Sequence, residues 1–271
     1  MLVVMKASSK SKPNVSTANG VTRHKVVSEK AWLVQRKELL KKEKIFTRQR
    51  DELSRQRHAL PWVKVEKPYV FDTPRGKAAL ADLFDGRSQL IVYHFMFGPD
   101  WKEGCDACSF LADHIDGANL HLSHHDVTLL AVSRAPLRKI APFKQRMGWR
   151  FKWVSSFGSD FNFDYHVSFT KQEIAQGKIY YNYELTEGGE EQPGVSVFFK
   201  DKSGDVFHTY SSYGRGGDQL IGTYNYLDLA PLGRNEKKGG GMDWMRLHDK
   251  YPAPPKMKNH GHETKAHRLQ R

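Results

Sequence analysis

The chain has 271 residues, of which 39% are hydrophobic and 12% aromatic, and its formal net charge at pH 7 is +13. This apolar content suffices for a packed core and excludes a wholly disordered chain. The chain has no apolar run of the ~18 residues that a membrane-spanning helix needs, and its apolar start is shorter than the ~7–15 residues of a secretory signal. We therefore expect a cytoplasmic protein with no membrane partner.

The excess positive charge lies at the two ends of the chain. Residues 1–60 carry 15 Lys and Arg against 5 Asp and Glu, residues 61–235 carry 19 against 21, and residues 236–271 carry 9 against 4. A basic arm can bind phosphate without sequence specificity, but a solvated helix face and a polar tail explain the same pattern. The nearly neutral centre argues against nucleic acid as the main partner.

The first expected elements are a polar arm and a long amphipathic helix. Residues 1–25 are polar and poor in aromatic residues, which predicts a disordered arm. Ser28 is a suitable N-cap for a helix over residues 28–57, which carries one apolar stripe on a charged surface. The pattern predicts that this stripe packs on the protein's own domain, and a homodimer through the helix is the alternative. The stripe consists of Trp32, Leu39, Phe46 and Leu53.

An alternation of strands and helices follows, which is typical of an α/β domain with a central mixed sheet. Two nearly continuous apolar runs predict strands that are buried on both faces. An alternating segment with a proline predicts an edge strand. The expected elements are the edge strand at 62–71, the buried strands at 89–97 and 127–132, a helix at 136–147 and a hairpin of 195–199 with 206–210.

These elements define the expected domain organisation. One α/β domain spans residues 26–235 and includes the helix at 28–57. The chain then becomes rich in Pro and Gly, so a loosely ordered basic tail is expected over residues 236–271.

The chemistry is concentrated in the only two cysteines, Cys105 and Cys108, which follow a buried strand and open a helical pattern. Two cysteines three positions apart indicate a redox-active or metal-binding pair rather than a structural disulfide. A helix N-terminus favours a thiolate, so Cys105 is the predicted nucleophile and Cys108 the resolving thiol. The negative charge of Asp106 opposes that thiolate, so Cys105 should be less acidic than the nucleophile of a strongly oxidising disulfide donor.

Several strings of the sequence resemble those of an uncharacterised bacterial family of thioredoxin-like proteins. The resemblance covers roughly residues 24–236 and implies a thioredoxin-like fold, with helices flanking the sheet, but it implies little about the substrate. The strings are Trp101-x-x-Gly104-Cys105-x-x-Cys108-Ser109-Phe110, Ala131-Val132-Ser133-Arg134-Ala135-Pro136, Met147-Gly148-Trp149, Ser155-Ser156-Phe157-Gly158-Ser159-Asp160-Phe161-Asn162 and Pro231-Leu232-Gly233-Arg234-Asn235-Glu236.

The wider resemblance to thioredoxin-fold oxidoreductases implies roles for residues around the pair. These proteins place a cis-proline opposite the cysteines, and Pro193 is the match. Trp101 and Pro193 would shape the docking surface, and Arg134 would steer an anionic substrate, with a surface ion pair as its alternative. The pair differs from thioredoxin's Trp-Cys-Gly-Pro-Cys, and Lys102 stands where peroxiredoxins have Thr, which disfavours peroxide reduction by their mechanism.

The leading hypothesis is a thiol–disulfide oxidoreductase that needs no cofactor, acts on a protein or small-molecule thiol or disulfide, and is recycled by a thiol reductant. The second is a non-catalytic binding module with basic arms. The third is a small structural zinc site, because His121 and His125 follow Cys105 and Cys108 at zinc-finger spacing. The cysteines open a helix rather than sit on a hairpin, which favours the redox hypothesis.

Other polar or Gly-rich segments have simpler interpretations. His94 lies within a strand and is expected to be a satisfied core histidine. Asp160, Asp164 and His166 could ligate a metal, but aspartates in loops more often cap helices. Residues 214–218 are Gly-rich, lack the Lys-Ser/Thr of a phosphate loop, and are expected to form a turn.

Overall fold

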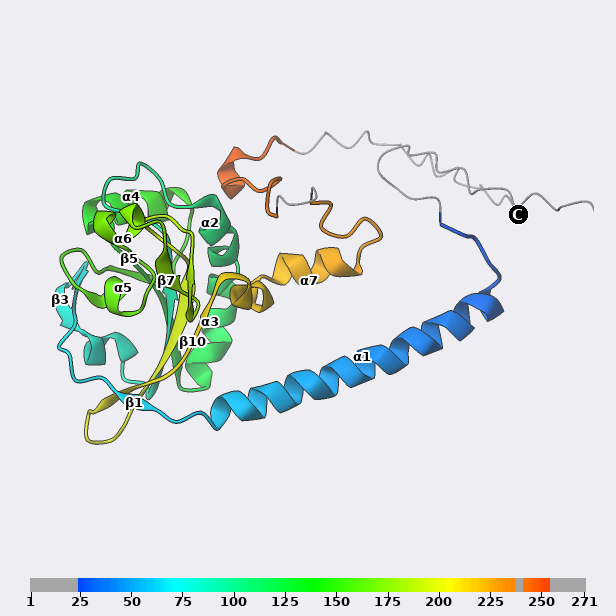
Figure 1. The fold of residues 1–271 in the computed structure, drawn as a ribbon, viewed down its shortest axis with the longest axis horizontal. Helices are drawn as coiled ribbons and strands as arrows, with labels where there is room; N and C mark the ends of the chain where they lie inside the picture. Colours follow the sequence, from blue (N-terminus) through cyan, green and yellow to red (C-terminus); the bar gives the residue numbers. More distant parts are fainter. Residues whose placement is uncertain (1–23, 237–240, 254–271) are drawn as a thin grey trace, which may run out of the picture.

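An eight-stranded mixed sheet forms the centre of the computed structural model, which describes residues 24–236 and 241–253 (Figure 1). The strand order is β1-β10-β9-β4-β5-β6-β2-β3, and β7 and β8 form a separate hairpin. The strands are β1 Val63–Lys64, β2 Val70–Thr73, β3 Gly76–Ala79, β4 Gln89–His94, β5 Val127–Ser133, β6 Lys152–Ser155, β7 Ile179–Tyr181, β8 Glu184–Thr186, β9 Gly194–Lys200 and β10 Val206–Tyr213.

Helices lie in the longer connections between these strands and before and after the sheet. No helix among the described residues is long and apolar enough to cross a membrane. The α-helices are α1 Glu29–His58, α2 Asp106–Ala112, α3 Ile115–His124, α4 Leu137–Arg146, α5 Phe161–Asp164, α6 Lys171–Ala175 and α7 Gly222–Leu229, and the 3₁₀ helices are η1 Leu80–Phe84, η2 Gly214–Leu220 and η3 His248–Lys250.

The middle of the sheet has the thioredoxin arrangement. β4 and β5 are parallel neighbours joined through α2 and α3, and β9 pairs antiparallel with β4 on its other side. β9 and β10 form an antiparallel hairpin, after which η2 and α7 follow. The thioredoxin-like α/β fold expected from the sequence is therefore confirmed.

The two faces of the sheet carry separate cores, because successive residues of a strand point to opposite sides. Leu90 and Val92 of β4 belong to the cluster that contains η1 and α5. Tyr93 and Phe95 belong to the cluster that contains α2 and α4. Helices thus cover both faces, and the continuous apolar run at residues 89–97 reflects this double burial.

The expected edge strand at residues 62–71 is two strands. β1 pairs only with β10 and lies at the sheet edge, whereas β2 pairs with both β3 and β6. Pro68 lies in the break between them, since proline lacks the N–H that a continuous ladder requires. The edge prediction is correct for β1 and wrong for β2.

The amphipathic helix forms, but it does not pack on the domain. The Ser28 side chain accepts a hydrogen bond from the Ala31 N–H and caps α1, as expected. α1 has no buried residue, and Trp32 and Phe46 of its stripe are 55% and 63% exposed. Figure 1 shows α1 running clear of the sheet. One apolar residue in every two turns makes a stripe too narrow to cover a core face, so the packing prediction is wrong; a homodimer through α1 stays a prediction.

The domain extends beyond the boundary expected at residue 235. Met245 and Leu247 are 3% and 0% exposed and belong to the cluster around α2 and α4. The Asp249 carboxylate also accepts a hydrogen bond of 2.8 Å from Arg146 of α4. The first part of the predicted loose tail is therefore packed structure. The rest of that tail, residues 254–271, and most of the predicted arm, residues 1–23, lie outside the described residues.

Candidate redox site

Cys105 and Cys108 lie at the start of α2, after the loop that follows β4, and both are free thiols. Cys105 is the N-cap of α2, with the extended backbone that a cap adopts. Its N–H donates to the Met96 carbonyl at 3.1 Å, and the Met96 N–H donates to the Cys108 sulfur at 3.4 Å. These two bonds fix both cysteines to the end of the buried strand.

The two thiols have opposite pKa shifts. Interaction with the Cys108 thiol, followed by N–H groups of Cys108 and Ala107, lowers the pKa of Cys105 to about 7 against the opposing effect of burial. Burial, followed by the neighbouring Cys105, raises the pKa of Cys108 well above its usual value. The pair therefore has one thiolate-forming member at the helix N-terminus and one protonated member behind it. The roles predicted from the sequence, Cys105 as nucleophile and Cys108 as resolving thiol, stay predictions.

Replacing Asp106 with asparagine should make Cys105 more reactive at acidic pH. The Asp106 carboxylate raises the pKa of Cys105 by charge repulsion, so its removal moves that pKa below 7. Alkylation by iodoacetamide at pH 6, followed by intact mass, should be about two- to fivefold faster in the variant. An unchanged pH profile would show that Asp106 does not act on the thiolate. Asp100→Asn, which removes a carboxylate from the loop that precedes α2, is the control.

Gly104 places the cysteine loop against the core. A Cβ at this position would lie 2.6 Å from a ring atom of Phe95 and 2.7 Å from one of Phe143, so only glycine lets the loop approach. Gly104→Ala should lower the free energy of unfolding by about 1–3 kcal/mol through overpacking. Gly117→Ala on exposed α3, where a Cβ meets nothing within 4 Å, should instead raise it by about 0.5–1 kcal/mol. Urea unfolding of Gly104→Ala and Gly117→Ala tests both predictions. Equal destabilisation of the two variants would show that Gly104 is not needed for close approach of the loop.

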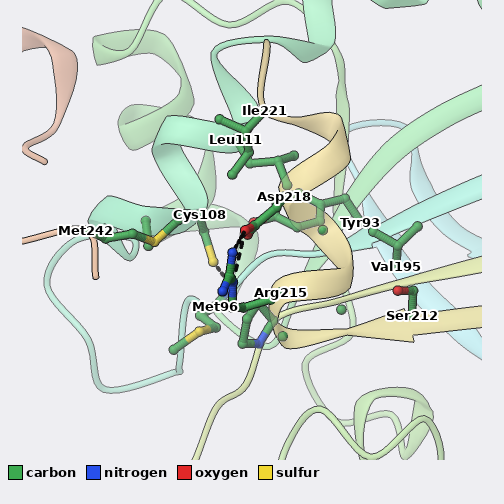
Figure 2. A pocket seen from close by; sticks show the side chains of 15 residues that line it. Tyr93, Met96, Cys108, Leu111, Val195, Ser212, Arg215, Asp218, Ile221 and Met242 are labelled. Atoms are coloured by element: carbon green, nitrogen blue, oxygen red, sulfur yellow. Dashed lines mark hydrogen bonds and ion pairs between the residues drawn. The ribbon is translucent and has the colours of Figure 1, made fainter. Parts of the chain in front are cut away.

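A cavity of about 240 Å³ adjoins the pair, and the Cys108 sulfur faces it (Figure 2). It lies between α2, the start of β9, and η2. The lining consists of Tyr93, Met96, Ala107, Cys108, Leu111, Pro193, Gly194, Val195, Ser212, Gly214, Arg215, Gly217, Asp218, Ile221 and Met242.

The structure gives the three expected docking residues different surroundings. Pro193 lines the cavity beside Cys108, and its carbonyl accepts a 2.7 Å hydrogen bond from Tyr181. The expectation of a cis peptide at Pro193 is wrong, because no described residue has one. Trp101 is half-buried near Gly98 and does not line the cavity. Arg134 also lies outside it and pairs with Glu191 at 3.1 Å. The two side chains are 15% and 1% exposed, so this pair is buried and is not the surface ion pair expected as the alternative.

Two parts of the site were not predicted from the sequence. Tyr93 is fully buried on β4, and its phenol interacts with the Cys108 thiol, which lowers the pKa of Cys108. The expected turn at residues 214–218 is part of η2 and forms one wall of the cavity. The alternation along β4 places Tyr93 on the same face as Phe95, toward α2, and this is the one signal that could have identified it.

The competing metal sites do not assemble. The described residues contain no group of three or more His, Cys, Asp or Glu side chains that could hold a metal ion, so His121 and His125 do not join the cysteines. Lys67 instead forms ion pairs with both Asp160 and Asp164. His94 is a core residue, as expected, and its Nε2 lies 2.8 Å from the Ser196 hydroxyl. Its Nδ1 is buried without a hydrogen-bond partner, so the expectation that the ring is satisfied is correct for one nitrogen only. Burial lowers the pKa of His94 to about 3.

Fold and site together define a thioredoxin-like protein with a polarised Cys-x-x-Cys pair. The chain belongs to the family described as bacterial protein of unknown function (DUF899), whose pattern matches residues 21–251. No curated protein matches the chain.

The solved structures that match the chain have low sequence identity to it and TM-scores below 0.5. Peroxidoxin BcpB from Mycobacterium tuberculosis is 13% identical, with a TM-score of 0.37 over 60% of this chain and 95% of that one. Peroxiredoxin Q from Xanthomonas campestris is 10% identical, with a TM-score of 0.39 over 60% and 95%. A protein described as thiol:disulfide interchange protein DsbE, from Chlorobium tepidum, is 13% identical, with a TM-score of 0.39 over 64% and 99%.

Proposed function

We propose that the protein is a thiol–disulfide oxidoreductase in which Cys105 is the nucleophile and Cys108 the resolving thiol. The observation that carries this proposal is the placement of the pair: Cys105 is the N-cap of α2, and Cys108 is buried in the first turn of that helix, where its sulfur accepts a hydrogen bond from the Met96 N–H. The opposite pKa shifts of the two thiols follow from this placement. A thiol with a pKa near ambient pH is the optimal attacking group, because it is largely ionised and still nucleophilic. A buried, protonated neighbour is protected until a mixed disulfide forms beside it.

The reaction proceeds in two exchanges. The Cys105 thiolate, having released its proton to solvent, attacks one sulfur of a substrate disulfide, and the other sulfur leaves as a thiolate that takes up a proton. Cys108 then attacks the Cys105 sulfur of the mixed disulfide, and its proton goes to the second departing thiolate. The protein dithiol is oxidised to a disulfide and the substrate is reduced to two thiols. An external thiol reductant restores the dithiol.

Reaction of the reduced protein with bis(2-hydroxyethyl) disulfide tests the proposal. The expected product is the protein with an internal Cys105–Cys108 disulfide, which intact mass spectrometry detects as the loss of two hydrogen atoms. Dithiothreitol should reverse the change. A stable mixed disulfide on Cys105 in the unaltered protein, or no reaction at either cysteine, would contradict the proposal.

Replacing Tyr93 with phenylalanine should slow the second exchange. The Tyr93 hydroxyl and the Met96 N–H both lower the pKa of Cys108, so they favour the thiolate that must form there. Loss of the hydroxyl should slow closure of the internal disulfide by about tenfold, with little change in the first exchange. Quenched-flow mass spectrometry separates the two steps. Tyr165→Phe, a buried tyrosine in the cluster on the other face of the sheet, should leave both rates unchanged.

A further inference from the structure

We infer that the cavity beside Cys108 binds the uncharged, apolar substituent of a small organic disulfide, which makes such compounds the preferred substrates. This inference rests on the proposed function and adds the substrate class to it. The cavity reaches the redox pair through Cys108, which lines it together with Met96 and with Ala107 between the cysteines, whereas Cys105 does not line it. The Cys105 thiol interacts with the Cys108 thiol, so it lies beside the cavity.

The walls of the cavity are mostly apolar. Leu111 and Ile221 contribute hydrocarbon, and Met96 and Met242 contribute flexible thioether side chains. Figure 2 shows these side chains arranged around the Cys108 sulfur. An alkyl or aromatic group that enters this space leaves water for hydrocarbon, which is favourable in proportion to the apolar area buried.

The charged groups at the cavity already have partners. Arg215 donates two hydrogen bonds to Asp218, at 3.0 and 3.1 Å, and Arg234 lies 3.4 Å from the same carboxylate. Arg215, whose side chain is 88% exposed, and Asp218 are the two charged residues among the described lining, and they pair with each other at the rim. A charged substituent that enters the apolar part of the cavity would lose its hydration and find no counter-ion there. Burying a charge without a partner is strongly unfavourable, so the site discriminates against charged disulfides.

The size of the cavity limits the substituent. Pockets for drug-sized ligands usually measure about 300–1,000 Å³, and this one measures about 240 Å³. A short alkyl chain or a single ring fits this volume, whereas a peptide-sized group such as the glutathione moiety exceeds it. Glutathione disulfide is therefore disfavoured by both size and charge.

The bound substituent fits the two exchanges already described. Cys105 attacks the substrate sulfur that carries the substituent, so the mixed disulfide joins Cys105 to the group in the cavity. The other half of the substrate leaves as a thiol. When Cys108 attacks the Cys105 sulfur, the group in the cavity leaves as the second thiol, and the atoms and electrons balance as before.

The test compares diethyl disulfide with bis(2-aminoethyl) disulfide, dithiodiglycolate and glutathione disulfide on the full-length reduced protein. Each second-order rate constant is divided by that of the same compound with free dithiothreitol, which removes intrinsic differences in reactivity. The rate ratio of diethyl disulfide should exceed that of each charged compound by at least about tenfold.

Two variants locate the preference in the cavity. A Cβ at Gly217 would lie 3.7 Å from Leu111, an ordinary contact, so Gly217→Leu should fill the space without disrupting the fold and slow diethyl disulfide about tenfold. Met242→Ala enlarges the cavity and should favour dibutyl disulfide over diethyl disulfide. Gly117→Leu on exposed α3 is the matched control and should behave as the unaltered protein does.

The outcomes separate this inference from the proposed function. Equal relative rates for charged and uncharged disulfides, or a Gly217→Leu variant that keeps full preference, would overturn the substrate class while leaving the oxidoreductase intact. Failure of the unaltered protein to reduce any of the four compounds would overturn both.

Discussion

Replacing Cys105 with serine should reduce the rate of disulfide reduction by at least about a hundredfold. The N–H groups of Ala107 and Cys108 lower the pKa of the Cys105 thiol and so favour its thiolate. A serine hydroxyl stays protonated near neutral pH even beside these groups, so the variant has no comparable nucleophile. The measurement is the steady-state oxidation of dithiothreitol by bis(2-hydroxyethyl) disulfide. Activity of the variant within threefold of the unaltered protein would show that Cys105 is not the nucleophile.

Cys108→Ser is the informative partner to this variant. It retains the nucleophile, so the first exchange should occur and the mixed disulfide on Cys105 should accumulate. Intact mass should then show one substrate half attached to the protein. If Cys108→Ser instead lost the first exchange and Cys105→Ser kept it, the assigned roles would be reversed.

Replacing Glu191 with glutamine should remove a pH dependence of stability of about 3 kcal/mol. Burial raises the pKa of Glu191 to about 7, against the opposing effects of Ser168 and Arg134. Between the usual carboxyl value of 4.5 and pH 7, the folded chain holds a proton that the unfolded chain has lost. Stability therefore falls as pH rises through this window. The contribution of protonated Glu191 to the free energy of unfolding is complete below pH 4.5 and is lost above pH 7.

The measurement is urea unfolding from pH 4.5 to 7.5 for the unaltered protein and two variants. The difference in unfolding free energy between Glu191→Gln and the unaltered protein should shift in favour of the variant across this window. Glu190→Gln is the control, because Glu190 contacts the same Arg134 but its side chain is 37% exposed. A pH-independent difference for Glu191→Gln would mean that this carboxylate is ionised throughout.

The sheet was largely predictable because its strongest signals are local. The segments that form β4 and β5 are apolar at nearly every position. Short apolar runs of this kind are typical of strands that are buried on both faces. The hairpin of β9 and β10 was marked by the turn residues Asp201 to Gly204 between two apolar runs.

Long-range packing was less predictable. The stripe of α1 repeats every seven residues, but periodicity does not show whether another surface lies against it, and none of its residues is buried. The segment that contains Met245 and Leu247 follows a Pro- and Gly-rich stretch, and composition alone predicted a loose tail. Two buried apolar side chains and the ion pairs of His248, Asp249 and Lys250 hold this segment on the core.

The candidate site divides in the same way. Cys105 and Cys108 were identifiable because their spacing and their position after a buried strand carry the chemistry. Tyr93, Gly217 and Met242 come from three distant parts of the chain, and only the fold brings them to the Cys108 side of the pair. The sequence therefore indicated the two sulfurs that we propose react, but not the cavity that we propose selects the substrate.

The most direct test of the account is a redox titration of the cysteine pair in the full-length protein. The protein is equilibrated across a series of dithiothreitol redox buffers, the free thiols are alkylated, and intact mass counts them. We expect a single two-electron transition between the dithiol and an internal disulfide, with a reduction potential of about −270 mV. Thiols that never pair across the series, or that resist alkylation until a chelator is added, would contradict it.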